Sequence, residues 1–90
     1  MGYTYIVTFE VKNLERLTKL KEKLMETKFY CPIHENAWAV NTEKKASELR
    51  DELISLTTAE DRLFVIRSGT EAAWINSYGE KHTDWLKKYL

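Results

Sequence analysis

The chain begins with a strict alternation of two kinds of side chain, and this pattern defines its first element. Residues 3–11, YTYIVTFEV, place apolar or aromatic side chains on one side and mostly polar ones on the other. The positions on the apolar side are Tyr3, Tyr5, Val7, Phe9 and Val11. Because successive side chains of a strand point to opposite faces, this run predicts a β-strand against a core. Residues 62–68, RLFVIRS, predict a second core strand by their β-branched and aromatic content.

Leucines recur every three or four residues in two later segments, and this spacing predicts two amphipathic helices. The first follows Asn13, a favourable N-cap, and ends near Thr27. The second is expected to begin after Thr42 as its N-cap. The apolar stripes consist of Leu14, Leu17, Leu20 and Leu24 in the first helix and Ala46, Leu49, Leu53 and Leu56 in the second.

The segment between the two predicted helices carries two short apolar runs, FYCPI and AWAV. The residues between these runs, 34–36, are polar, which predicts a β-hairpin. Pro32 cannot donate to a strand ladder, so it favours a sheet edge for the first run. Near the end of the chain, residues 73–76 (AWIN) are a candidate fifth strand, and Thr83 is expected to cap a last short helix.

The predicted order is strand, helix, strand, strand, helix, strand, followed by a small extension. This order consists of two strand–helix–strand (βαβ) units. Together they form an α+β, ferredoxin-like βαββαβ sandwich, with an antiparallel four-stranded sheet and both helices on one face. A short C-terminal strand and helix would extend it. Ninety residues fit one domain, 1–90, and leave no room for a second.

The charge balance and the single cysteine limit the classes of function. Lys and Arg together number 14, as do Asp and Glu, so no overall field attracts nucleic acid, although a local basic face is still allowed. The one cysteine, Cys31, excludes an internal disulfide and favours a reducing compartment. Without a His/Asp signature around it, Cys31 is expected to be a buried small hydrophobe. With no signal peptide and no long apolar run, we expect a cytoplasmic protein without a membrane partner.

Five pieces of the chain, taken in order, carry a resemblance to a known family. They are YIVTFEV (5–11), NAWAVNT (36–42), DRLFVI (61–66), AAWI (72–75) and DWLKKYL (84–90). Together they resemble the CRISPR-associated protein two family, the small dimeric subunit of the spacer-integration complex, and most of all its short uncharacterised relatives. The resemblance spans nearly the whole chain.

This resemblance implies a homodimer whose sheets face one another, with the end of the first strand near the dimer axis. It also implies an association with nucleic acid or a nucleotide. Some members of the family are metal-dependent nucleases, in which an aspartate ending the first strand binds a divalent ion. The matching position here is Glu10.

Glu10 is therefore the candidate catalytic and metal-binding residue, with Mg²⁺ as the candidate ion. One carboxylate from each protomer could share the ion, which would activate water. Glutamate is one methylene longer than aspartate, however, and a displacement of about 1 Å can cost roughly a hundredfold in rate. The alternative is a solvated strand end paired with Lys12 or Lys28. His34 and His82 are expected to be surface residues.

A second group of candidates surrounds the end of the strand at 62–68. Ser68 and Thr70 could hydrogen-bond a phosphate, Arg67 could form a basic edge with Arg62, and Trp74 could stack on a base. The alternatives are a plain turn, solvated charges, and a tryptophan buried in the core or in a dimer interface.

Three functions follow from these expectations. The first is a dimeric ferredoxin-like protein that associates with nucleic acid or a nucleotide. Catalysis is doubtful for it, because the sequence shows no acid/base pair. The second is a metal-dependent endonuclease of RNA or DNA that uses Glu10. The third is a structural dimer inside a larger assembly.

Overall fold

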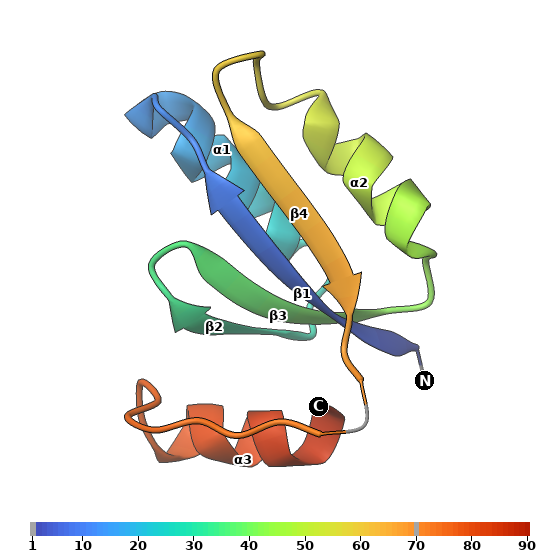
Figure 1. The fold of residues 1–90 in the computed structure, drawn as a ribbon, viewed down its shortest axis with the longest axis vertical. Helices are drawn as coiled ribbons and strands as arrows, with labels where there is room; N and C mark the ends of the chain where they lie inside the picture. Colours follow the sequence, from blue (N-terminus) through green and yellow to red (C-terminus); the bar gives the residue numbers. More distant parts are fainter. Residues whose placement is uncertain (1, 70) are drawn as a thin grey trace.

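Four strands form one antiparallel sheet in the computed structural model, which describes residues 2–69 and 71–90 (Figure 1). In chain order the elements are β1 (Tyr3–Glu10), α1 (Leu14–Met25), β2 (Tyr30–His34), β3 (Ala37–Thr42), α2 (Ala46–Ile54), β4 (Arg62–Arg67) and α3 (Glu80–Tyr89). The strand order across the sheet is β2-β3-β1-β4. This α+β arrangement is consistent with a ferredoxin-like fold.

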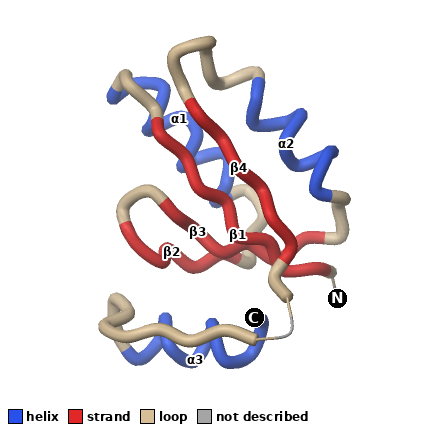
Figure 2. Tube along the Cα trace, viewed as in Figure 1, coloured by secondary structure: helices blue, strands red, loops and turns tan. Residues whose placement is uncertain are grey.

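Helices α1 and α2 cover one face of the sheet and enclose the main core with it (Figure 2). The side chains that are fully or almost fully buried come from both layers, as the two sequence periodicities predicted. They include Val7, Leu20, Leu24, Val40, Leu49 and Leu53. Trp38 belongs to this core: it is 6% exposed and stacks on Tyr30 with 5.4 Å between ring centroids.

Helix α3 packs on the opposite face of the sheet, against β2. A second, smaller core lies beneath it, built from Cys31, Ala39 and Leu86. The buried Thr4 hydroxyl donates a hydrogen bond of 2.6 Å to the carbonyl of Tyr89, which ties β1 to the end of α3. Because α3 lies over β2, β3 and the first half of β1, this face stays open over the end of β1 and over β4.

The start of α1 agrees with the sequence, whereas the start of α2 does not. Asn13 caps α1, and its side chain accepts a 3.0 Å hydrogen bond from the N–H of Arg16. Thr42, the predicted cap of α2, is the last residue of β3. Three more residues turn the chain from the sheet to the helix layer, so α2 begins at Ala46, and Glu48 accepts a 2.9 Å hydrogen bond from the N–H of Lys45.

The C-terminal extension also differs from its prediction. Residues 73–76 do not form a strand; Asn76 has a φ of 58°, which interrupts an extended backbone, and Ile75 is 84% exposed, with no sheet beneath it. Helix α3 begins at Glu80, so Thr83 lies within it and not at its cap. The segment after β4 instead runs back along α3 (Figure 1). Within the described ranges, no helix is both long and apolar enough to cross a bilayer.

Candidate functional site

Glu10 ends β1 directly opposite Arg62, the first residue of β4. Its carboxylate accepts a 2.6 Å hydrogen bond from Nη1 of Arg62 and lies 3.6 Å from Nζ of Lys12. The Arg62 hydrogen bond, together with the charges of Lys12 and Arg62, lowers the pKa of Glu10. Glu10 is thus an ionised, half-exposed carboxylate whose partners include Lys12, as one sequence alternative expected, and Arg62, which the sequence did not indicate.

The surroundings of Glu10 do not by themselves make a magnesium site. Two cationic side chains already neutralise the carboxylate, and their charge opposes a divalent cation. Across residues 2–69 and 71–90, no group of three or more His, Cys, Asp or Glu side chains is arranged to hold a metal ion. Magnesium at Glu10 therefore stays a prediction that requires a second copy of the chain to supply further ligands.

A shallow hollow of about 910 Å³ surrounds Glu10 at one end of the sheet. Its walls come from the ends of β1 and β4 and from the β2–β3 turn, and include His34, Asn36, Arg62 and Phe64. His34 is exposed, as predicted, and its Nδ1 accepts a 3.3 Å hydrogen bond from the N–H of Asn36. The hollow thus brings the carboxylate of Glu10, the imidazole of His34 and the guanidinium of Arg62 to one end of the sheet, and Asp61 also lines it.

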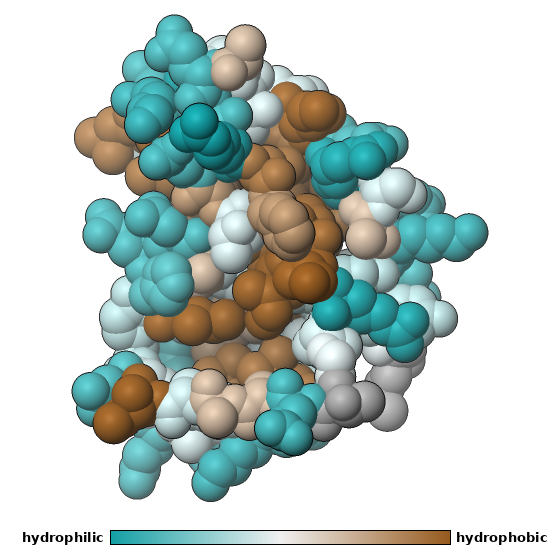
Figure 3. All heavy atoms as spheres, viewed as in Figure 1, coloured by the Kyte–Doolittle hydropathy of each residue, from teal (hydrophilic) through white to brown (hydrophobic). Residues whose placement is uncertain are grey.

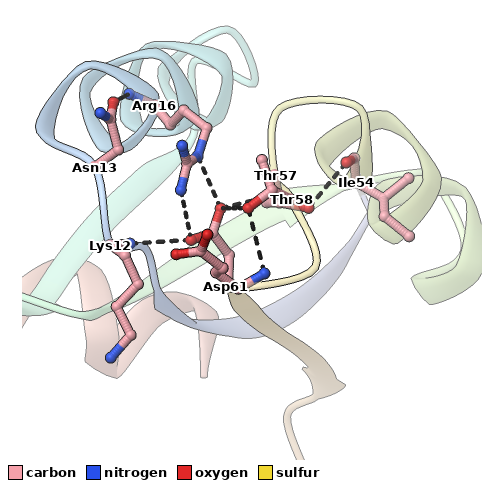
Figure 4. Close-up of polar contacts among 8 residues, drawn as sticks. Lys12, Asn13, Arg16, Ile54, Thr57, Thr58 and Asp61 are labelled. Carbon is pink, nitrogen blue, oxygen red and sulfur yellow. Dashed lines mark hydrogen bonds and ion pairs between the residues drawn. The ribbon is translucent and has the colours of Figure 1, made fainter.

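Asp61, which also lines this hollow, has a role that the sequence did not indicate (Figure 4). Its carboxylate is fully buried, and it accepts hydrogen bonds of 2.9 and 3.0 Å from the guanidinium of Arg16. It also accepts hydrogen bonds from the backbone N–H groups of Lys12, at 3.0 Å, and Thr58, at 2.9 Å. These bonds, the Arg16 bond first, hold the pKa of Asp61 well below its ordinary value. Both carboxylate oxygens of Asp61 accept hydrogen bonds from α1, from the segment that follows β1 or from the α2–β4 loop. Asp61 therefore joins these segments and does not face a ligand.

One local signal could have indicated this role. Thr58 precedes Asp61 by three residues, and an aspartate that accepts a nearby backbone N–H is typical of a tight loop. The partner Arg16 lies 45 residues away, so sequence spacing does not reveal it.

The predicted ligand-binding residues after β4 are only partly brought together. Ser68 and Trp74 line one hollow of about 210 Å³ against α3. Arg67 lies elsewhere, with its guanidinium carbon 4.0 Å from the centroid of the Tyr3 ring. The N–H of Ser68 donates to the carbonyl of Thr4 at 2.8 Å, which continues the β1–β4 ladder. Thr70 lies outside the described residues.

The open half of the outer sheet face carries two large apolar side chains of β4. Phe64 is 60% exposed and lies opposite Thr8, and Ile66 is 50% exposed and lies opposite Ile6. Figure 3 shows hydrophobic side chains gathered in a band across this face. Leu63 and Val65, on the other side of β4, pack against the main core. The strand predicted at 62–68 as a core strand therefore has only its alternate residues in the core.

Cys31 is buried under α3, as expected. It is 2% exposed, and its Sγ lies 3.8 Å from the carbonyl oxygen of His82. Burial raises the pKa of the thiol, which disfavours the reactive thiolate. The structure therefore gives Cys31 a packing role.

Comparison with known proteins yields a fold without a function. No family model and no curated protein matches the chain. A crystal structure of a hypothetical protein, TT1823 from Thermus thermophilus, is similar, with a TM-score of 0.67 and 15% sequence identity. The match covers 84% of this chain and 93% of that one. At this identity the likeness shows a shared fold alone.

Proposed function

We propose that this chain is a ferredoxin-like homodimer that binds nucleic acid or a nucleotide without cutting it. The observation that carries the proposal is the exposed pair Phe64 and Ile66, which lie on the same open face of the edge strand β4. Apolar surface removed from water contributes about 25 cal/mol per Å², so two such side chains favour a partner that covers them. The family resemblance of the sequence supports a second copy of the chain as that partner.

The edge of this face also suits a second copy. Glu10 and Arg62 lie next to Phe64 and carry opposite charges. In a two-fold contact each patch meets its own copy, so a neutral, self-paired edge avoids repulsion between like charges. The whole chain has a formal net charge of zero, which adds no long-range repulsion between the copies.

The oligomeric state tests this part of the proposal. Light scattering at micromolar concentration should give the mass of a dimer, and Phe64→Ser should give that of a monomer. Ile54→Ser is the matched control, because Ile54 is 55% exposed but lies on α2, behind the sheet. A wild-type monomer, or equal dissociation of both variants, contradicts the sheet-face dimer.

Binding without cutting is supported by the charges. The carboxylate of Glu10 is already held by two cations, whereas Lys81 and Lys88 of α3 form no ion pair within the described part of the chain. These lysines are the local basic face that a neutral composition still allows. A thermal-shift screen across nucleotides and oligonucleotides should raise the melting temperature, since a ligand of the folded state stabilises it.

Metal-dependent cleavage is the second candidate function, and one relationship favours it. Glu10 lies in the same hollow as Phe64, so two copies that meet over the open face would bring their Glu10 residues towards one another. Mg²⁺ or Mn²⁺ would then be required for cleavage of RNA or DNA, and Glu10→Ala would abolish it. A dimer that binds no oligonucleotide and cuts none would instead support the structural role in a larger assembly.

A further inference from the structure

A second hollow, of about 500 Å³, lies between the edge strand β2 and helix α3, away from Glu10. It combines aromatic side chains with two lysines, Lys28 just before β2 and Lys81 on α3. Its lining includes Lys28, Phe29, Lys81, Trp85 and Tyr89. We call this hollow the β2–α3 groove.

The aromatic rings of the groove form a continuous series. Phe29 is 52% exposed, and its ring centroid lies 6.4 Å from that of Tyr89. The Tyr89 ring in turn lies 4.7 Å from that of Trp85, which is partly exposed. Exposed rings next to one another offer flat surfaces on which unpaired bases stack, whatever their sequence.

The charges of α3 are divided between its two sides. Lys81 lines the β2–α3 groove, and Nζ of Lys88 lies 5.5 Å from the centroid of the Tyr89 ring. The carboxylates of Glu80 and Asp84 line a different hollow, on the far side of the helix. Over the described residues, the groove lining therefore contains cationic and aromatic groups and no carboxylate.

Lys28 adds a cation at the other wall of the groove. It follows α1 with a φ of 67°, a left-handed conformation that glycine adopts far more easily than lysine. Neither Lys28 nor Lys81 forms an ion pair with any residue in 2–69 or 71–90. Two lysines without carboxylate partners flank the exposed rings, so the groove suits a ligand that has both anionic and planar groups.

We propose that the β2–α3 groove binds single-stranded nucleic acid, with bases stacked on Phe29 and Trp85 and phosphates held by Lys28 and Lys81. The inference rests on the proposed nucleic-acid binding and assigns a place to it. A nucleic-acid strand is favoured over a peptide for two reasons. The ionisable side chains of the lining are lysines and one histidine, with no carboxylate, and most of its apolar side chains are aromatic rings.

Fluorescence anisotropy with labelled decauridine at low salt tests the groove. Phe29→Leu keeps an apolar side chain but removes the ring, and should weaken binding about tenfold. Lys28→Gly and Lys81→Gln should each weaken binding severalfold and reduce the slope of log K against log salt by about 0.7. Lys28→Gly also places glycine at a left-handed backbone position that glycine adopts without strain. The melting temperature of this variant should therefore not fall, and a loss of binding would not be due to unfolding.

Lys87→Gln is the matched control, because Lys87 lies on the same helix but lines the hollows on its other side. It should bind decauridine as the wild type does. If the wild type binds and the three groove variants bind equally well, the groove is not the binding site, although the proposed nucleic-acid binding is still supported. A wild type that binds neither RNA nor DNA strands overturns both. Uridine monophosphate should displace decauridine only at far higher concentration. If it displaces decauridine at equal concentration, the groove binds a single nucleotide and not a nucleic-acid strand, which contradicts the proposal.

Discussion

Arg16 holds Asp61 through two parallel hydrogen bonds, from Nε to Oδ2 at 2.9 Å and from Nη2 to Oδ1 at 3.0 Å. This paired geometry is the stronger type of arginine–carboxylate contact. It joins the first turn of α1 to the residue that precedes β4, across the end of β1 where Glu10 lies. The pair therefore helps to fix the start of α1 against the start of β4.

Asp61→Asn should lower the melting temperature by about 5–10 °C, because the amide cannot accept the full set of hydrogen bonds that the buried carboxylate accepts. Thermal unfolding followed by circular dichroism measures this change. Asp51→Asn is the control, since Asp51 pairs with Arg50 on the surface and is 64% exposed. Its melting temperature should change by about 2 °C or less. Equal shifts for the two variants contradict the role given to Asp61.

Stability should also decrease in acid because of the same carboxylate. The folded pKa of Asp61 lies below its ordinary value of 3.8, and that of Glu10 below 4.5. The unfolded chain therefore binds protons first, so the stabilisation is complete above about pH 5 and is lost as the pH falls through the folded pKa values. Urea midpoints should fall steeply below about pH 4.5, with a shallower fall in Asp61→Asn. Identical pH profiles count against this account.

The thiol of Cys31 should report whether α3 is docked. In the folded protein it should react with a thiol reagent many times more slowly than in urea, because it is 2% exposed and lies beneath α3. Leu86→Ala removes a side chain of the same small core and should raise the reaction rate about tenfold or more, through local opening. Ile75→Ala, at an 84% exposed position, should not. A fully reactive thiol in the wild type contradicts the packing of α3.

Local patterns predicted most of the fold. The alternation through Val7 and the leucine spacing through Leu20 place these residues in one core, and the hairpin turn lies where the polar residues 34–36 indicated it. Such patterns work because a strand or helix with one apolar face must bury that face. Asn13 caps its helix for an equally local reason, the 3.0 Å bond to the N–H of Arg16.

The remainder depends on contacts between distant residues. Arg16 and Asp61 are 45 residues apart and come together only through the tertiary fold. Nothing near Phe64 in sequence indicates that α3 covers β2 and leaves β4 open. The apolar segment at 73–76 resembles a strand, but it has no sheet edge to join. At the candidate site, Glu10 was identified from the family resemblance, and its partner Arg62 follows from the β1–β4 register.

A combined assay separates binding of nucleic acid from its cleavage. End-labelled single-stranded RNA and DNA are incubated with the dimer and Mg²⁺ or Mn²⁺, and each sample is run on native and denaturing gels. The account predicts a retarded complex on the native gel and full-length oligonucleotide on the denaturing one, for both the wild type and Glu10→Ala. Metal-dependent shortening by the wild type that Glu10→Ala abolishes would contradict it.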